Sequence, residues 1–291
     1  MTAGQSRHIV AAHPPITAGQ SRHAVVGPLG LGVNARTQPG APLLHVKGLS
    51  VAFGGLRAVQ SVSLELPSGT LSALIGPNGA GKTTLFALMS GFLKPDSGSV
   101  HFNGRDITGQ PPHLNARAGL TRTFQTVQPF ASQTVRENIA VGAHLHQRSR
   151  RLALAEAEAV AQRVGLAALL DQPAADLTVA GRKRLELARA LATRPKLLLL
   201  DEVLAGLNPH EIAEMIPLVR AIVRDAAGGG ITVLLIEHVM QAVMNLAEWV
   251  WVLAQGELIA AGTPAEVTSN PRVIEAYLGH GAAARLAAHP S

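Results

Sequence analysis

Cysteine is absent from the 291 residues of this chain, and aromatic residues make up only 3% of them. The lack of cysteine excludes a disulfide framework, a thiolate-bound zinc, an iron–sulfur cluster and a cysteine nucleophile. It also favours a cytoplasmic protein. With so few aromatic rings there is little on which nucleic-acid bases could stack, so we expect no nucleic-acid partner.

Acidic residues are absent from the first 60 positions, which hold five of the 25 basic residues of the chain. This imbalance accounts for most of the net charge of +6, because the first acidic residue is Glu65 and the rest of the chain is nearly neutral. The folded part is therefore not expected to carry the basic surface that is typical of nucleic-acid binding.

Long hydrophobic runs are also lacking. The longest clear ones, Leu197–Leu200 and Ile231–Ile236, have the length of a buried strand and fall far short of the roughly 20 residues that cross a bilayer. The N-terminus has no apolar segment of the kind found in secretory signals. We therefore expect a chain that does not span a membrane.

Residues 1–42 contain the heptapeptide TAGQSRH twice, at Thr2–His8 and Thr17–His23, among proline, glycine and alanine. A low-complexity sequence of this kind cannot bury a core. We interpret it as a flexible extension in preference to a metal-binding or partner-binding tag that uses His8 and His23.

The chain as a whole, with 47% apolar residues, has the composition of a packed globular protein. A folded domain is predicted over 43–280, with a tail at 281–291. Strands alternate with helices in its pattern, which predicts an α/β fold with a mostly parallel sheet. The dipeptide Asn103-Gly104 predicts a hairpin turn. Strand patterns cover 43–53, 58–66, 71–75, 99–102, 197–200 and 231–236, and helical patterns cover 152–170, 182–193 and 210–225.

The octapeptide GPNGAGKT lies between an apolar strand and an apolar helix. It fits the pattern GxxxxGK[ST], whose glycines let backbone N–H groups converge on phosphate oxygens at a helix N-terminus. Lys82 is expected to reach the β- and γ-phosphates, and Thr83 to ligate Mg²⁺. The sequence therefore predicts a nucleoside triphosphate site made of Gly76, Pro77, Asn78, Gly79, Ala80, Gly81, Lys82, Thr83 and Thr84.

Two carboxylates, Asp201 and Glu202, directly follow the apolar run 197–200. A P-loop needs an acidic partner for its metal at the end of a neighbouring strand, and we predict that Asp201 holds Mg²⁺ through water. Glu202 is predicted to orient and activate the attacking water, which hydrolysis needs and passive binding does not. The less favoured interpretation is a carboxylate that caps the next helix.

On these motifs the chain resembles the ATP-binding subunits of ABC transporters, from about Leu43 to Gly279. Phe53, in the string VAFGG, matches the aromatic residue of that family that stacks on adenine, with an ordinary core phenylalanine as the alternative.

Three further positions extend the resemblance. Gln125 ends the string RTFQ and matches the glutamine that contacts the metal and the attacking water. His238 follows a predicted strand and matches the switch histidine, which would bind the γ-phosphate and help to position Glu202. Asn208 ends the string AGLN, which matches the D-loop, where many relatives have aspartate.

The strings RTFQ, AGLNP, IEH and GTP, and above all VIEAYLG at 273–279, resemble the ATPases of branched-chain amino acid uptake systems. Closely similar ATPases serve urea and other small amides. The resemblance therefore implies the type of transporter more firmly than its solute.

One motif departs from the family. The signature LSGGQ is replaced by LTVAG, so that Thr178 keeps a hydroxyl, whereas Val179 and Ala180 stand where the family has its two glycines, and Gly181 follows them. Thr178 and Gly181 are still expected to help cover the γ-phosphate held by an opposite subunit, provided that the backbone keeps negative φ. The basic run 182–184 is interpreted as a solvated helix face in preference to a phosphate contact.

The resemblance implies an α/β fold with a P-loop nucleotidase core, an N-terminal antiparallel β-subdomain and an inserted helical subdomain at about 126–192. It implies an ATPase that uses ATP and Mg²⁺ and forms a head-to-tail homodimer, or a heterodimer with a second ATPase subunit. The dimer would be peripheral, on the cytoplasmic face of the inner (plasma) membrane, and would energise integral membrane transporter subunits that take up branched-chain amino acids. The alternatives are a regulatory subunit with little turnover and an ATPase for urea or amide uptake.

Overall fold

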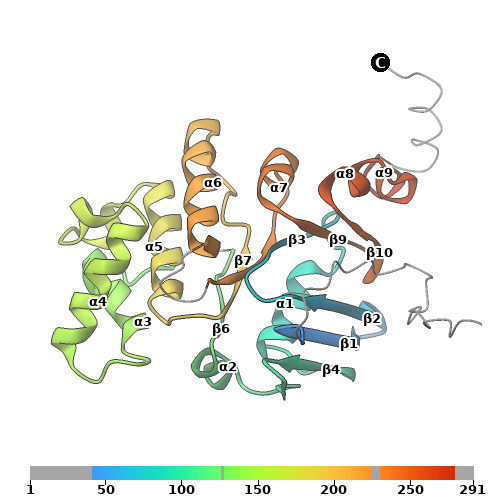
Figure 1. Ribbon diagram of the computed structural model, residues 1–291, viewed down its shortest axis with the longest axis horizontal. Helices are drawn as coiled ribbons and strands as arrows, with labels where there is room; N and C mark the ends of the chain where they lie inside the picture. The colour runs from blue at the N-terminus through green and yellow to red at the C-terminus, as the bar shows by residue number, and fades with distance from the viewer. Residues whose placement is uncertain (1–40, 126–127, 225–229, 279–291) are drawn as a thin grey trace, which may run out of the picture. The chain divides into compact units, whose positions relative to one another are not determined.

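The computed structural model describes residues 41–125, 128–224 and 230–278 (Figure 1). The tail predicted at 281–291 lies outside these ranges, as does the predicted N-terminal extension except for its last two residues. Within the described ranges the chain forms two β-sheets and a series of α-helices.

The first sheet has the strand order β2-β1-β4-β5 and is antiparallel throughout. Between its last two strands, Asn103 and Gly104 have φ angles of 49° and 74°. This is the backbone of a tight hairpin turn, as the dipeptide predicts. The expected antiparallel sheet at the start of the domain is confirmed. Its strands are β1 (Leu44–Phe53), β2 (Leu56–Leu66), β4 (Ser97–Phe102) and β5 (Arg105–Asp106).

The second sheet has the strand order β10-β9-β3-β8-β7-β6. Neighbouring strands are parallel except for the pair β9 and β10, so the predicted α/β fold with a mostly parallel sheet is confirmed. The strands are β3 (Leu71–Ile75), β6 (Leu120–Arg122), β7 (Leu197–Asp201), β8 (Thr232–Ile236), β9 (Trp249–Ala254) and β10 (Glu257–Gly262).

Three strands of this sheet, β6, β9 and β10, are absent from the sequence-based prediction. The hairpin of β9 and β10 does carry a signal, because short apolar runs, WVWVLA and LIAA, flank Gln255-Gly256, a dipeptide with φ angles of 50° and 81°. Strand β6 has only three residues, which is too short for a periodic pattern to be recognised.

The helices differ from the predicted ranges at their ends. The predicted helix 152–170 ends at Arg163, because Gly165 takes a φ of 72° and stops the helix. The predicted helix 182–193 begins three residues early, at Val179, because the Thr178 side chain caps it by accepting from the Gly181 N–H at 3.1 Å. The helices are α1 (Lys82–Ser90), α2 (Pro112–Ala118), α3 (Val135–Ala143), α4 (Arg150–Arg163), α5 (Val179–Leu191), α6 (Pro209–Arg224), α7 (Met240–Leu246), α8 (Pro264–Thr268) and α9 (Pro271–Leu278), with 3₁₀ turns at Ala167–Leu169 and Ala174–Asp176.

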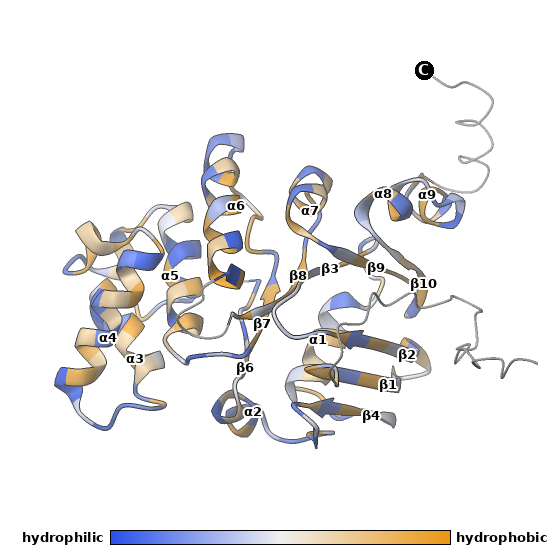
Figure 2. Ribbon diagram, viewed as in Figure 1, coloured by the Kyte–Doolittle hydropathy of each residue, from blue (hydrophilic) through white to orange (hydrophobic). Residues whose placement is uncertain are grey.

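The parallel sheet buries both of its faces. Leu198 and Leu200 of β7 pack into a core shared with helices α3 to α7, whereas Leu197 and Leu199 pack into a core shared with α1 and the antiparallel sheet. Figure 2 shows the apolar colour on β7 and β8. A strand that is covered on both sides reads as a continuous apolar run, as LLLL does here. Helices α3, α4 and α5 lie together beyond one edge of the sheet (Figure 1).

Strand β2 offers a matched pair of leucines for a stability test. Leu66 is fully buried, whereas Leu56 keeps 72% of its surface exposed. We expect Leu66→Ala to lower the free energy of unfolding by about 2–5 kcal/mol through lost burial and a cavity. Leu56→Ala should change it by less than about 0.5 kcal/mol. Urea denaturation followed by circular dichroism measures both, and equal losses would contradict the core assignment.

Candidate active site

The register of the parallel sheet brings the predicted site residues to one edge. Asp201 of β7 pairs with Ile236 of β8, and Leu74 of β3 pairs with the same Ile236. The segments that follow these three strands therefore leave the sheet side by side at its carboxyl edge, which is where open α/β sheets bind ligands. These segments are the P-loop, Glu202 and the dipeptide Glu237-His238.

The P-loop fits tightly against the neighbouring strands. Gly76 and Gly81 have φ angles of 151° and 100°. A Cβ at Gly76 would lie 1.9 Å from the Leu253 carbonyl oxygen, and a Cβ at Gly81 would lie 2.3 Å from the Ala58 carbonyl oxygen. Both positions therefore require glycine, as the phosphate-binding motif does. The loop leads directly into α1, whose N-terminal N–H groups favour an anion.

Lys82 is buried at the start of α1. Its Nζ donates to the carbonyl oxygens of Gly76 at 2.8 Å and Pro77 at 3.0 Å, so it is held over the loop with one proton left for a phosphate oxygen. Burial lowers the pKa of Lys82, and the nearby carboxylates Glu202 and Asp201 oppose this shift. The two carboxylates thus favour the charged ammonium that phosphate binding requires.

Asp201 is almost completely buried and accepts a hydrogen bond from Arg122, whose Nη2 lies 2.7 Å from its Oδ2. Burial raises the pKa of Asp201, and the bond to Arg122 opposes that shift. Among the described residues, the other oxygen of Asp201, Oδ1, is buried without a hydrogen-bond partner. A buried oxygen of this kind suits a hydrated Mg²⁺, and Thr83 is exposed on the first turn of α1 with a second oxygen ligand.

Glu202 lies at the centre of a hydrogen-bonded group. Its Oε2 accepts from Gln125 Nε2 at 2.7 Å, and its Oε1 lies 2.5 Å from His238 Nε2. Glu202 itself has a φ of 51°, which is uncommon for any residue except glycine and is held here by the bond from its N–H to Ile236 O at 3.0 Å. The structure thus brings together the three side chains predicted to be catalytic, Gln125, Glu202 and His238.

Lys183 corrects the sequence-based interpretation of the basic run 182–184 as a solvated helix face. Only 7% of its surface is exposed, and its Nζ donates to the Glu202 carbonyl oxygen at 2.9 Å. Because Glu202 is in a left-handed conformation, its carbonyl is accessible to this side chain from α5. Neighbouring Arg184 pairs with Glu214 at the surface. Helical periodicity places Lys183 on the apolar face with Leu187, which is the signal that identifies it.

Glu237 is a buried acid that sequence reasoning passes over. Its Oε1 accepts from the N–H of Leu204 at 2.8 Å, and the N–H of His238 also donates to it. Burial raises the pKa of Glu237 to about 7. The carboxyl group therefore joins the segment after Glu202 to the segment that carries His238.

The remaining predicted site residues lie outside this cluster. Phe53 ends β1 with 48% of its surface exposed, so it is not a core residue. Its ring is free to pack on a ligand. Thr178 caps the N-terminus of α5, and Gly181 lies in its first turn. The hydroxyl of Tyr277, on α9, accepts from the N–H of Gly76, which ties the end of the described chain to the P-loop.

The arrangement combines a phosphate-binding loop, a buried carboxylate for a metal and a glutamate held by hydrogen bonds beside a histidine. This combination defines a P-loop nucleoside triphosphatase. Residues 59–205 match the family model of ABC transporters, and residues 257–283 match that of branched-chain amino acid ATP-binding cassette transporters.

Individual proteins show the same relationship. The chain is 40% identical to the high-affinity branched-chain amino acid transport ATP-binding protein BraF of Pseudomonas aeruginosa, with 82% of this chain and 98% of that protein covered. It is 42% identical to the corresponding LivG protein of Salmonella typhimurium over the same shares. A crystal structure of the ADP conformation of an ATP-binding cassette is 32% identical, with a TM-score of 0.74, and covers 83% of this chain and all of that one.

The chain thus belongs to the ATP-binding subunits of ABC transporters, a family that binds nucleotide and hydrolyses ATP to drive transport.

The raised pKa of Glu237 predicts a pH dependence of stability. The folded state holds this proton more tightly than the unfolded chain, where the pKa is 4.5. The contribution to the free energy of unfolding is therefore complete below about pH 4.5 and is lost as the pH rises through about 7. A shift of this size corresponds to about 3 kcal/mol.

Glu237→Gln keeps an acceptor for Leu204 and cannot ionise. Between pH 5 and pH 8, the free energy of unfolding of the wild type should fall by up to about 3 kcal/mol relative to that of this variant. Urea midpoints of both proteins at the two pH values measure this difference, and parallel curves would contradict it. All other titrating groups are the same in the two proteins, so their contributions cancel in the difference between the two stabilities.

Proposed function

We propose that this chain is the ATP-hydrolysing subunit of a transporter that takes up branched-chain amino acids. The observation that carries the proposal is the hydrogen-bonded group of Gln125, Glu202 and His238 beside the P-loop, because hydrolysis needs an oriented water and passive binding does not. The similarity to BraF and LivG, and the match of residues 257–283, support this solute over urea and other amides.

In this proposal the P-loop residues Gly76 to Thr84 hold the triphosphate, and Lys82 donates its remaining proton to the terminal phosphates. Phe53 stacks on adenine. Thr83, Gln125 and Asp201 supply the oxygens that face Mg²⁺. When bound, Mg²⁺ would neutralise phosphate charge during transfer of the γ-phosphoryl group. The buried Oδ1 of Asp201 supports this assignment.

Glu202 is the proposed general base. One of its oxygens takes the proton of the attacking water, and the bonds to Gln125 and His238 fix where that oxygen points. His238 is then placed to donate to the γ-phosphate. Lys183 donates from Nζ to the backbone carbonyl of Glu202, which restricts how far the Glu202 carboxylate can move.

We propose further that two such subunits close head to tail, as a homodimer or with a second ATPase subunit. Thr178 and the first turn of α5 would cover the γ-phosphate held by the opposite subunit. Val179 and Ala180 do not have positive φ and form the first helical residues, so the two substitutions need no strained backbone. The N-terminal N–H groups of α5 are retained, which supports turnover over a purely regulatory role.

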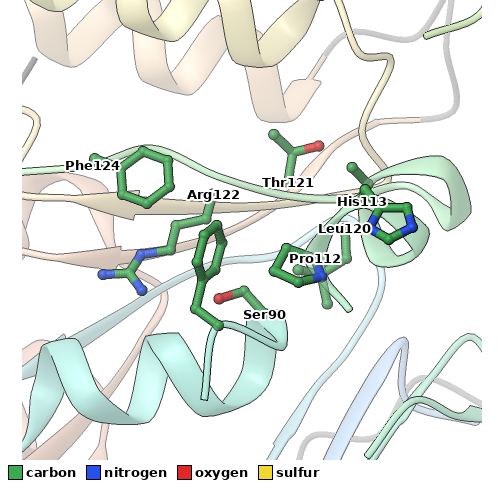
Figure 3. Close-up of a pocket in the computed structure, with 9 residues that line it drawn as sticks. Ser90, Pro112, His113, Leu120, Thr121, Arg122 and Phe124 are labelled. Atoms are coloured by element: carbon green, nitrogen blue, oxygen red, sulfur yellow. The ribbon is translucent and has the colours of Figure 1, made fainter. Parts of the chain in front are cut away.

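Integral membrane subunits are the proposed partners, at the cytoplasmic face of the inner membrane. No helix among the described residues is long and apolar enough to span a bilayer. A mainly apolar pocket near the Gln125 segment offers a docking place for a membrane subunit, with exposed Phe92 and Phe124 in its lining (Figure 3). Exposed aromatic residues around a pocket are common at interaction sites.

The catalytic assignment predicts the behaviour of Glu202→Gln. This variant keeps the shape of the side chain and loses the base, so it should bind ATP and stay closed as a dimer. Glu248→Gln, an exposed substitution away from the site, should remain like the wild type. Size-exclusion chromatography with and without ATP measures the dimer. The partner ATPase has to be present in a parallel run, and a monomer in both runs would contradict the dimer.

Adding Thr178→Val to this variant tests the signature loop. The dimer should weaken by about 1.5–3 kcal/mol per site, the worth of a hydroxyl bond to a charged group. Thr178→Ser keeps the hydroxyl and serves as the control. A dimer that is insensitive to Thr178→Val would speak for the regulatory alternative.

The proposed solute is tested in the complete transporter. The integral subunits that copurify with this chain from membranes are identified and reconstituted with it in liposomes. ATP hydrolysis should rise with leucine, isoleucine or valine and their binding protein, and should not rise with urea or amides. Stimulation by urea alone would overturn the branched-chain assignment and leave the ATPase assignment intact.

A further inference from the structure

Arg122, the last residue of β6, forms a buried ion pair with the carboxylate assigned to the metal. Its side chain is 7% exposed and that of Asp201 is 1% exposed, and their Nη2 and Oδ2 atoms lie 2.7 Å apart. A charge so deeply buried needs a partner of opposite sign, since an unpaired buried carboxylate tends to take up a proton.

The ion pair occupies only one oxygen of Asp201. The bond from Arg122 goes to Oδ2, whereas Oδ1 is buried without a hydrogen-bond partner in the part of the chain that the structure describes. The backbone N–H of Asp201 is bonded separately, to Thr123 Oγ1 at 3.0 Å. The carboxylate is thus fixed at one oxygen and open at the other.

The guanidinium is itself held by aromatic rings from two segments. It lies 5.8 Å from the ring centroid of Phe86, on the helix that follows the P-loop, and 5.5 Å from that of Phe124. Phe124 in turn packs edge-on against Phe92 at 5.3 Å. Figure 3 shows Arg122 and Phe124 in the lining of the pocket described above. The guanidinium of Arg122 therefore contacts both a ring that lines the pocket and the carboxylate assigned to the metal.

We propose that Arg122 is a positioning residue for Mg²⁺: it holds Oδ2 of Asp201 so that Oδ1 faces the metal, and its contact with Phe124 makes this position sensitive to what occupies the pocket. The proposal rests on the proposed function only in assigning Mg²⁺ to Asp201. A partner that hydrogen-bonds a metal-facing carboxylate orients it, and loss of such a partner usually lowers metal affinity about 10- to 100-fold.

The test uses the full chain without membrane subunits and a fluorescent ATP analogue, with Mg²⁺ titrated from an EDTA-treated start. Arg122→Met keeps an unbranched apolar stem between the rings and removes the guanidinium. We expect the Mg²⁺ concentration at half-saturation to rise about 10- to 100-fold. Binding of the analogue in EDTA should be unchanged, which also shows that the variant is folded.

Two substitutions control for the change of side chain. Arg122→Lys can rebuild a single N–H bond to Oδ2 and should restore the Mg²⁺ titration to within a few-fold of the wild type. Arg189→Met removes another partly buried arginine that stacks on a ring, Phe130 at 5.1 Å, and bonds the Gln128 carbonyl instead of a carboxylate. It should leave the titration unchanged.

Phe124→Ala tests the link to the pocket at an exposed side chain, where truncation is tolerated. It should weaken Mg²⁺ binding several-fold. Phe92→Ala removes a ring that packs on Phe124 and should weaken Mg²⁺ binding by a smaller factor. A Phe124→Ala titration equal to that of the wild type would overturn the link to the pocket.

The outcomes separate this proposal from the function on which it rests. If the wild type responds to Mg²⁺ as expected and Arg122→Met reaches half-saturation at the same or a lower Mg²⁺ concentration, the role of Arg122 alone is overturned. Wild-type nucleotide binding that ignores Mg²⁺ would overturn the metal assignment and the proposal with it. If Arg122→Met does not fold, the Lys and Phe124 variants decide.

Discussion

The in-register pairing of three parallel strands is the constraint on which the active site depends. Leu74, Ile236 and Asp201 lie across from one another, so the P-loop, Glu202 and His238 leave the sheet at the same level. A shift of one residue in β7 would turn Asp201 to the opposite face of the sheet. The apolar cores on both faces fix that register, because each leucine of β7 belongs to one core or the other. Packing therefore determines the chemistry at the edge.

Much of this could be predicted from the sequence, and the parts that could not share a physical cause. The P-loop and the Asp201-Glu202 pair are local motifs next to strong apolar strands, so their fold and position follow from a short window. Arg122 and Glu237 act through contacts with residues distant in the chain, at sequence separations that no periodic pattern reveals. Helical periodicity does place Lys183 on the apolar face of α5, but the pattern does not identify its partner, the Glu202 carbonyl. The charge of Lys183 also predicts an exposed side chain, because lysine is rarely buried without a partner, and its partner here is a backbone carbonyl that the sequence does not indicate.

The substitutions at Val179 and Ala180 fall where the backbone places no demand for glycine. Glycine is required at Gly76 and Gly81, where positive φ and close neighbours exclude a side chain. At Val179 and Ala180 the chain is an ordinary first helical turn, capped by Thr178, and Val179 keeps its side chain in solvent. Glycine is thus indispensable in the P-loop, whereas the backbone at the start of α5 accepts other residues.

The crowding of the P-loop has a mechanical consequence. The loop is wedged between the carbonyls of Leu253 in the parallel sheet and Ala58 in the antiparallel sheet, and Gln60 N–H bonds Gly256 O at 2.8 Å across the same junction. A rotation that brought the sheets closer together would press these carbonyls against the loop backbone. The P-loop and the Gln60–Gly256 bond therefore couple the two sheets at this junction, so that bending between the sheets is resisted where the loop lies.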